Sequence, residues 1–349
     1  MTSHLSARAR QEGTPLIEDR RVTFLWLGAK APELMGDFSD WEAGQRIKLD
    51  KLEPGVWGYT LDLPNDAYIE YSFIDGNRHV LDPLNRRRRT PNGIGHTNNF
   101  FYMPKGAKTP LARRNPAISH GTVTRRTIVP QFLLDDAPAR PVYLYQPPVK
   151  VPVPLLVVWD GWDYFHRAAL VTITDNLIAQ QRIRPVALAM VQNGDRARNV
   201  EYDCSEATLA FLHEQILPVA RQELNLVDVA RHPGAYGVMG ASMGGLMAMY
   251  TALRLPHIFG HVLSQSGAFL PEDEPESLLK TLFHRKNKLP LSIWMDVGRF
   301  DFLLQQNRSF NIFLEKLQYA HGYHEYAGGH NCPAWRDDVW RGLEYLFGV

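Results

Sequence analysis

Hydrophobic and polar residues follow two different patterns along the chain, with a change near residue 104. Before that point, apolar and polar positions alternate in short runs, among them 22–26, 55–61 and 68–73, with Gly, Pro, Asn and Asp between the runs. Such alternation predicts strands joined by turns, and regular short strands indicate a sandwich of immunoglobulin-like type. Residues 1–104 are therefore predicted to form an N-terminal β-sandwich domain.

A second pattern begins at residue 121, where continuous apolar runs alternate with helical segments. The predicted helices include residues 175–182, 205–224 and 244–254. Strands that alternate with helices favour a mostly parallel sheet, so residues 121–349 are predicted to form an α/β domain. Residues 104–116 are rich in Pro, Lys and Arg, and we place a linker between the two domains at residues 105–120.

One serine stands out within the second pattern. Ser242 lies in the sequence Gly-Ala-Ser-Met-Gly-Gly, between an apolar run at 235–239 and a segment at 246–253 with the composition of a buried helix. Strand, tight turn and helix are the setting in which G-x-S-x-G forms a nucleophile elbow. Its glycines keep side chains away from the turn, so that the serine oxygen stands exposed. We identify Ser242 as the candidate nucleophile; the other interpretation is a packing turn without chemistry.

A serine nucleophile needs a base that a third group holds in place, and in hydrolases with such an elbow the acid comes before the histidine along the chain. Residues 291–297 read as a buried strand, and Asp301 follows that strand before a helical pattern at 303–320. The loop after a strand is where the acid is expected, so Asp301 is the first choice. Asp296 is the alternative, but it lies inside the apolar run, where a structural role is expected.

The candidate base is His330, which follows Ala-Gly-Gly in a loop before the last predicted helix. A catalytic imidazole needs such a loop in order to reach across the edge of the sheet to the serine. His324 lies within a short predicted strand, and His321 ends the predicted helix before it. These two histidines are expected to be surface or packing residues.

Two backbone N–H groups must stabilise the negative charge of the reaction intermediate. Met243, directly after the candidate nucleophile, supplies one of them in an elbow of this kind. The apolar strand 155–159 ends in Asp-Gly-Trp, and we nominate the N–H of Trp162 as the second donor, with the indole as a wall of the pocket. The alternative interpretation is that Trp159 and Trp162 are core aromatics.

Arginines near these loops are candidates for binding an anionic substrate. Arg196 and Arg198 follow the predicted strand 186–191, and a run of four arginines occupies residues 86–89. The planar fork of guanidinium donors suits carboxylate or catecholate oxygens. The run at 86–89 has a second interpretation as a solvated face.

Several separated motifs together resemble the enterochelin esterase branch of the esterase D group of α/β-hydrolases. The motifs lie at residues 158–161, 240–246, 262–267, 307–310, 328–330 and 335–336. The resemblance covers roughly residues 122–349 and implies an ester-cleaving α/β-hydrolase, with trilactone catecholate siderophores as the name-giving substrates. By position it implies a triad of Ser242, Asp301 and His330. Many members carry Glu or another residue at the place of Asp301, and some are thought to work without the acid.

The first domain resembles the glycogen-binding modules of starch-acting enzymes. The matching stretches are residues 36–41, 55–57, 71–73, 82–83 and 98–99. Trp41 matches the first sugar-stacking aromatic, but Asn77 and Arg78 stand where the second is expected, and Ser72 replaces the lysine. With half of the platform missing, we expect a domain that shapes the mouth of the active site rather than one that binds sugar.

Composition describes an ordinary soluble globular protein, and we expect it to need no cofactor or metal. With 38 Lys and Arg against 37 Asp and Glu, the net charge provides no general attraction to nucleic acid or membranes. Cys204 and Cys332 form no disulfide framework and suit a reducing compartment. The first 20 residues are polar and resemble no export signal, so a cytoplasmic protein is expected. The sequence leaves the oligomeric state open.

The sequence therefore predicts a serine carboxylic ester hydrolase that works through an acyl-enzyme. The leading substrate is a small-molecule ester, a ferric catecholate siderophore of the enterochelin type. The alternatives are a feruloyl or acetyl esterase that acts on plant polysaccharide, or a general short-chain esterase. A non-catalytic carbohydrate-binding or regulatory protein is the alternative from another class, and the order of elbow, acid and histidine argues against it.

Overall fold

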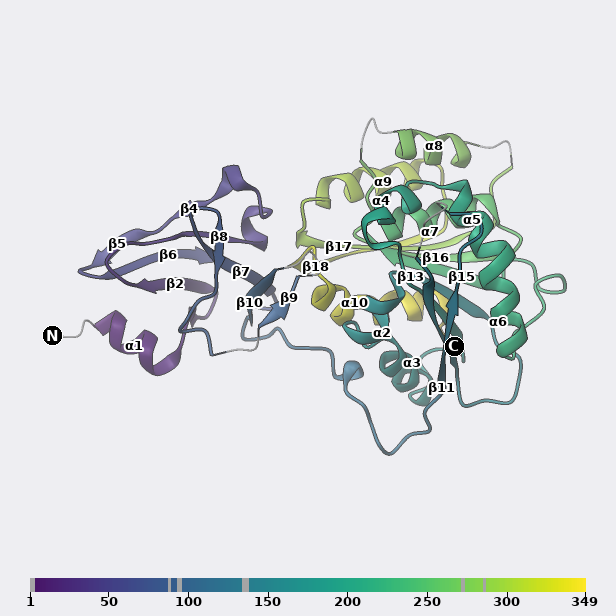
Figure 1. Cartoon of the computed structure of the whole chain (residues 1–349), viewed down its shortest axis with the longest axis horizontal. Helices are drawn as coiled ribbons and strands as arrows, with labels where there is room; N and C mark the ends of the chain where they lie inside the picture. Colours follow the sequence, from purple (N-terminus) through teal and green to yellow (C-terminus); the bar gives the residue numbers. More distant parts are fainter. Residues whose placement is uncertain (1–3, 87–88, 93–95, 134–137, 271–273, 285–286) are drawn as a thin grey trace. The chain divides into compact units, whose positions relative to one another are not determined.

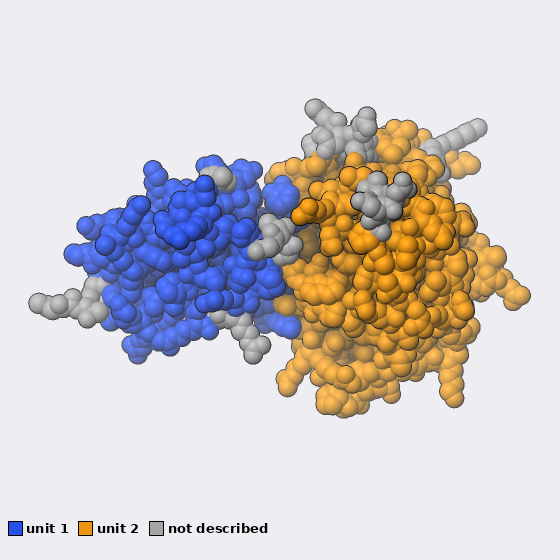
Figure 2. Space-filling view, viewed as in Figure 1, with its two compact units in different colours: residues 1–108, 298–302, 326–334 blue, residues 109–297, 303–325, 335–349 orange. Residues whose placement is uncertain are grey.

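A computed structural model of the chain describes all residues except 1–3, 87–88, 93–95, 134–137, 271–273 and 285–286. The described chain divides into two compact units, which Figure 2 shows in different colours. Unit 1 contains residues 1–108, 298–302 and 326–334. Unit 2 contains residues 109–297, 303–325 and 335–349.

The N-terminal part of unit 1 is built from two antiparallel sheets with the strand orders β1-β2-β6-β5 and β4-β3-β7-β10-β9, with β8 paired to β7. A short helix, α1 (His4–Glu12), precedes them (Figure 1). The strands are β1 (Leu16–Glu18), β2 (Arg21–Leu27), β3 (Glu33–Gly36), β4 (Ile47–Lys48), β5 (Asp50–Glu53), β6 (Val56–Asp62), β7 (Tyr68–Asp75), β8 (Arg78–Val80), β9 (Thr90–Pro91) and β10 (Thr97–Tyr102).

The two sheets enclose one apolar core, as a sandwich requires. Phe24 of β2 packs edge-on against Tyr71 of β7 at 4.9 Å and against Phe101 of β10 at 5.9 Å between ring centroids. All three rings are fully buried. The predicted strands at 22–26, 55–61 and 68–73 correspond to β2, β6 and β7.

On the sandwich, the two features that the sequence offered for ligand binding have partners within the protein. The indole N–H of Trp41 donates a hydrogen bond to Oδ1 of Asp37 at 2.9 Å. Arg86 donates to the backbone carbonyl of Arg10. The middle of the arginine run, residues 87–88, lies outside the described residues.

Unit 2 is built on the sheet β11-β12-β14-β13-β15-β16-β17-β18. Strands β14, β13, β15, β16 and β17 pair in parallel, while β11 and β12 are antiparallel to their neighbours. The strands are β11 (Thr122–Ile128), β12 (Arg140–Gln146), β13 (Leu155–Trp159), β14 (Ala187–Val191), β15 (Tyr236–Ala241), β16 (Phe259–Gln265), β17 (Ser292–Phe300) and β18 (His321–Gly329). Every residue of β13, β14 and β15 is buried, which explains the continuous apolar runs in the sequence.

Helices alternate with the strands of this sheet and one helix follows the last strand, as the alternating pattern predicted (Figure 1). They are α2 (Gly161–His166), α3 (Leu170–Ala179), α4 (Arg198–Tyr202), α5 (Glu206–Phe211), α6 (Leu217–Glu223), α7 (Met243–Arg254), α8 (Glu274–Phe283), α9 (Leu304–Lys316) and α10 (Cys332–Phe347). Residues 244–253 of α7 are all buried. Within the described part of the chain, no helix is long and apolar enough to span a membrane.

Two local features differ from the sequence prediction. The helix expected at 303–320 ends at Lys316, so His321 begins β18 instead of ending a helix. In the segment predicted as a linker, Leu111 is buried, and the side chain of Asn176 in α3 donates to its carbonyl at 2.7 Å. Asn176 also donates to the carbonyl of Arg113 at 2.9 Å. Buried hydrogen bonds of this kind fix residues 109–113 on unit 2, which the Pro-rich composition did not indicate.

Candidate active site

Ser242 occupies a strained turn between β15 and α7. Its backbone angles are φ 59° and ψ −124°, a conformation that is costly for any residue with a side chain. The Ser242 N–H donates to the carbonyl of Gln265 at 2.9 Å, and its own carbonyl accepts from the N–H of Ala268 at 3.1 Å. These hydrogen bonds, together with the strand and helix on either side, hold the geometry of a nucleophile elbow.

Two glycines of the motif are required because β15 and α7 approach each other closely. A Cβ atom on Gly240 would lie 2.5 Å from the backbone of Gly244. A Cβ atom on Gly245 would lie 2.5 Å from Oγ of Ser264. Such distances exclude any side chain at these positions, so the helix can start directly behind the serine.

Asp301 and His330 form a buried hydrogen-bonded pair in unit 1. The Nδ1 atom of His330 lies 2.9 and 3.0 Å from the two carboxylate oxygens of Asp301. The Asp301 side chain is fully buried, whereas the His330 side chain is 17% exposed. A carboxylate at Nδ1 holds the proton on that nitrogen, so Nε2 is the ring nitrogen that can act as the base. Each residue directly follows a strand, β17 and β18 respectively.

Asp296, the alternative acid, belongs to a different network. It lies inside β17 with no exposed surface. Its carboxylate accepts hydrogen bonds from Nε1 of Trp294 at 2.9 Å and from Nε2 of Gln265 at 3.2 Å. The Gln265 side chain also accepts from the hydroxyl of Tyr164 at 2.9 Å. Asp296 therefore fixes the side chain of Gln265, whose backbone carbonyl holds the elbow.

The other two histidines near the end of the chain have structural partners. Nε2 of His324 lies 3.5 Å from a carboxylate oxygen of Asp338. The two ring nitrogens of His321 contact the carbonyl of Tyr319 and Oδ1 of Asn311, at 2.8 and 2.9 Å. Both histidines therefore serve packing, as the sequence predicted.

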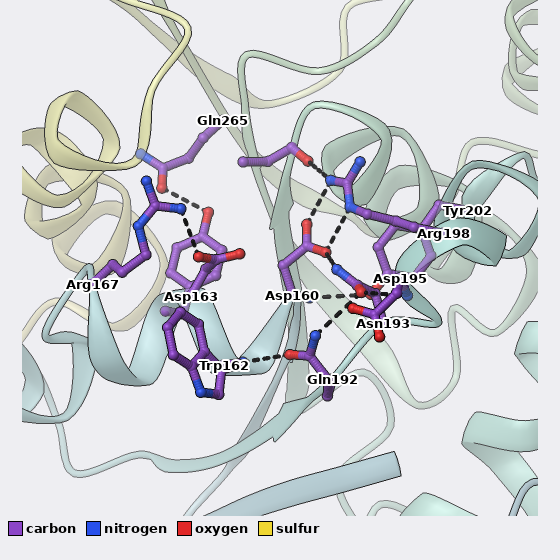
Figure 3. Close-up of polar contacts among 12 residues, drawn as sticks. Asp160, Trp162, Asp163, Arg167, Gln192, Asn193, Asp195, Arg198, Tyr202 and Gln265 are labelled. Carbon is purple, nitrogen blue, oxygen red and sulfur yellow. Dashed lines mark hydrogen bonds and ion pairs between the residues drawn. The ribbon is translucent and has the colours of Figure 1, made fainter. Parts of the chain in front are cut away.

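An ion pair behind the elbow was not predicted from the sequence. Arg198 binds both carboxylate oxygens of Asp160, from Nε to Oδ1 at 2.7 Å and from Nη2 to Oδ2 at 2.6 Å (Figure 3). Nη2 of Arg198 also donates to the carbonyl of Ala241, the residue before the nucleophile, at 3.2 Å. Asn193 donates to Oδ1 of Asp160 at 2.5 Å. The guanidinium thus joins the loop after β13 to the elbow.

These contacts add a second interpretation of Arg198. Its guanidinium contacts Asp160 and Ala241, which supports a positioning role, and the substrate contact that we predicted for Arg198 stays a prediction. Arg196, the other predicted arginine, is exposed. One signal for the ion pair was present in the sequence, because Asp160 directly follows the apolar strand 155–159. That signal does not show which arginine binds Asp160.

Trp162, the predicted second oxyanion donor, is the second residue of α2. Its N–H donates to Oε1 of Gln192 at 3.0 Å (Figure 3), so this amide reaches an oxyanion only if the Gln192 side chain moves. The indole is 45% exposed, unlike that of Trp159, which is a core aromatic. Met243 is the first residue of α7, and first-turn amides have no acceptor within their own helix.

Comparisons with known proteins identify the family of the chain. The Esterase family model, described as "Putative esterase", matches residues 138–346, well over half of the chain. The iron(III) enterobactin esterase of Dickeya dadantii (strain 3937) is 25% identical, over 96% of this chain and 90% of that protein.

Solved structures share the fold of this chain to different extents. A crystal structure of the Shigella flexneri enterobactin esterase, in the presence of enterobactin, has a TM-score of 0.76 at 19% identity and covers 98% of this chain and 97% of that chain. A ferulic acid esterase from Anaeromyces mucronatus has a TM-score of 0.56 at 16% identity, over 68% of this chain and 95% of that chain. The predicted α/β-hydrolase fold is therefore confirmed, and the chain belongs to the Esterase family.

Proposed function

We propose that this protein cleaves a carboxylic ester through an acyl-enzyme on Ser242. His330 takes the Ser242 proton as the oxygen attacks the ester carbonyl carbon, and Asp301 stabilises the resulting imidazolium. The amides of Met243 and Trp162 bind the oxyanion, for Trp162 after Gln192 has moved. His330 then protonates the departing alcohol oxygen, and a water molecule activated by the same histidine hydrolyses the acyl-enzyme.

The topology supports this assignment of roles. Ser242, Asp301 and His330 directly follow β15, β17 and β18, three strands of one sheet. In open α/β sheets the loops at the carboxyl ends of the strands carry the reactive groups. The hydrogen bonds of His330 to Asp301, with the strained backbone of Ser242, are the features that a base and a nucleophile of this kind require.

We further propose that the substrate is a siderophore ester of the enterobactin type. Its hydrolysis would break down the iron complex and release the iron. The observation that carries this proposal is the extent of the match to the Dickeya enterobactin esterase, which includes the N-terminal sandwich. The ferulic acid esterase, by contrast, matches only 68% of the chain. Arg196 is the candidate for binding the anionic iron complex, because it is exposed and a guanidinium suits catecholate oxygens.

The cell compartment is part of the same proposal. Cys204 and Cys332 are buried thiols rather than a disulfide, which suits a reducing environment. A siderophore esterase there would act on complexes that have already been imported. We therefore propose a cytoplasmic enzyme with no cofactor of its own.

The first experiment tests the chemistry and the substrate class together. Turnover of ferric enterobactin, a feruloylated oligosaccharide and p-nitrophenyl butyrate is measured for the wild type and for Ser242→Ala. We expect ferric enterobactin to have the highest kcat/KM, and Ser242→Ala to lose roughly 10⁵–10⁶-fold in kcat on every substrate. Ser277→Ala, on the exposed face of α8, is the matched control.

Each contrary result has its own meaning. Wild-type turnover by Ser242→Ala would refute the nucleophile. A preference for the feruloylated substrate, with Ser242 essential, would favour the polysaccharide esterase that the fold match to the Anaeromyces enzyme supports. Equal values for all three substrates would indicate a general short-chain esterase.

The second experiment separates Arg196 from Arg198. Arg196→Ala should raise KM for ferric enterobactin about 10-fold and leave p-nitrophenyl butyrate unchanged, because a rim charge acts on the charged substrate only. Arg198→Ala should lower kcat on both substrates, since it releases the elbow carbonyl of Ala241. Similar effects of Arg196→Ala on both substrates would contradict the proposed role of Arg196.

A further inference from the structure

A loop of the N-terminal sandwich packs directly against the segment that carries His330. The segments 298–302 and 326–334 belong to the same compact unit as residues 1–108 (Figure 2). One of these contacts is made by Asp37, which lies in the stretch 36–41 that the sequence offered as half of a sugar-binding platform. A role in sugar binding does not explain why this stretch contacts the segment that carries His330.

Asp37 is the centre of this loop, and the residue is only 2% exposed. Oδ2 accepts the N–H of Glu70 at 2.8 Å and Nδ2 of Asn331 at 3.3 Å. Oδ1 accepts the indole N–H of Trp41 at 2.9 Å. One carboxyl group thus joins a core strand, its own loop and the segment after β18.

The loop around Asp37 is itself held in a demanding conformation. The hydroxyl of Ser39 bonds to both the N–H and the carbonyl of Gly36, at 3.1 Å each. Asp40 and Trp41 adopt positive φ values of 50° and 55°, which residues with side chains rarely adopt. A rigid loop of this kind can serve as a fixed support, and strain of this kind is commonly found where function depends on geometry.

On the other side of the contact, Asp37 touches the chain on both sides of His330. A Cβ atom on Gly329 would lie 2.2 Å from Cγ of Asp37, so the carboxyl group packs on the backbone there. Asn331 donates to Asp37, and its own Oδ1 accepts the N–H of Ala334 at 3.0 Å in the first turn of α10. His330 lies between these two fixed residues.

A purely structural role does not account for an acid at this position. Burial and the neighbouring Glu70 raise the pKa of Asp37, and the Asp301 carboxylate adds to the effect. The groups that face Asp37 thus include two further carboxyl groups, and burying an acid beside them costs stability that an apolar side chain would not. The benefit must lie in the hydrogen bonds that the carboxyl group accepts.

We propose that Asp37 is a positioning residue for the reaction, which fixes the peptide on both sides of His330 so that the imidazole is aimed correctly. The inference rests on the proposed role of His330 as the base. It makes the N-terminal sandwich part of the catalytic machinery rather than an attached binding module. Small misplacements of a catalytic group lower rates strongly, which is why a support so far away in the sequence matters.

The test compares Asp37 with an equally buried acid of the same sandwich. Asp82 is also 2% exposed and accepts hydrogen bonds from the hydroxyls of Thr14 and Tyr71, at 2.7 Å each. The full-length variants Asp37→Ala, Asp37→Asn and Asp82→Ala are assayed with p-nitrophenyl butyrate for kcat and KM, and their melting temperatures are recorded. His330→Ala is assayed in parallel as the reference for a missing base.

We expect Asp37→Ala to lower kcat by roughly 10–10²-fold with little change in KM, since geometry and not binding is lost. Asp37→Asn should recover most of that loss, because its amide oxygen can still accept from Glu70 and Asn331. Asp82→Ala should lower the melting temperature but keep kcat near that of the wild type. If Asp37→Ala does not fold, Asn331→Ala removes the same hydrogen bond from the other side and should show the same split between kcat and KM.

Other outcomes overturn the inference in different ways. Equal effects of Asp37→Ala and Asp82→Ala on kcat would mean that Asp37 only stabilises the sandwich. An unchanged kcat in folded Asp37→Ala, with His330→Ala inactive, would overturn the positioning role and leave the proposed function intact. Full activity of His330→Ala would overturn the proposed function and this inference together.

Discussion

Asp301 and Arg198 are two side chains whose roles follow from the groups that they contact. The Asp301 side chain is fully buried, and both of its oxygens lie within hydrogen-bond distance of Nδ1 of His330. The Arg198 guanidinium donates hydrogen bonds to Asp160 and to the backbone of the elbow. A side chain with such partners positions other groups, so both residues are expected to act on kcat rather than on substrate affinity.

Replacement of Asp301 by Asn tests whether Asp301 sets the position of the proton on the His330 ring. The amide can donate to Nδ1 of His330, which favours the tautomer with its proton on Nε2 and leaves the serine proton without an acceptor. Asp301→Asn should therefore lower kcat by about 10³–10⁴-fold, as in other triads, with the overall fold intact by circular dichroism.

Asp296→Asn is the matched control for this prediction. It changes a buried acid whose partners are Trp294 and Gln265, so it should lower the melting temperature more than it lowers kcat. A loss of activity in Asp296→Asn equal to that in Asp301→Asn would mean that the acid role is shared or misassigned.

The residues of the catalytic chemistry could be predicted from the sequence because each follows a recognisable local signal. Ser242 lies between an apolar strand and a buried helix, and His330 follows two glycines after a strand. The supporting contacts carry no such signal. Asp37 and Asn331 are 294 residues apart in the chain, and only the folded chain brings them together.

At the scale of elements, the turn between β15 and α7 combines the strained backbone of Ser242 with the close approach of the strand and the helix at Gly240 and Gly245. The core strands could be predicted because they are buried on both faces and read as unbroken apolar runs. The end of α9 and the start of β18 could not, because they depend on contacts between elements, such as the hydrogen bond between His321 of β18 and Asn311 of α9.

Two glycines of the elbow should respond differently to the same substitution. In Gly240→Ala the new methyl group would lie 2.5 Å from the backbone of Gly244, which cannot move without displacing α7. In Gly244→Ala the nearest atom is a carboxylate oxygen of Asp160 at 3.1 Å. We expect Gly240→Ala to destabilise the protein by at least about 3 kcal/mol and Gly244→Ala by much less.

Urea unfolding of both variants measures this difference directly. The control is built into the pair, because the two substitutions add the same methyl group four residues apart. Comparable unfolding midpoints for Gly240→Ala and Gly244→Ala would show that β15 and α7 can separate, and the elbow would then be less rigid than the structure indicates.

At the scale of the whole molecule, the compact units do not follow the order of the sequence. Unit 1 contains the sandwich together with the segments 298–302 and 326–334, which arrive from the far end of the chain. These two segments carry Asp301 and His330. A cut between the domains in sequence therefore does not remove the contacts between the sandwich and the segments that carry these two residues.

Limited trypsin digestion should reveal this organisation. Arg114 is exposed, whereas the carbonyl of Arg113 is held by Asn176, so we expect the first cleavage after Arg114, where the backbone is accessible. The two fragments, 1–114 and 115–349, should elute together in size-exclusion chromatography and retain esterase activity, because the larger one carries the segments that pack on the smaller one. Separation in urea followed by refolding of 115–349 alone should yield little activity, since His330 then lacks its support from Asp37. Fragments that separate spontaneously, with full activity in 115–349, would contradict this prediction and show that the sandwich is dispensable for catalysis.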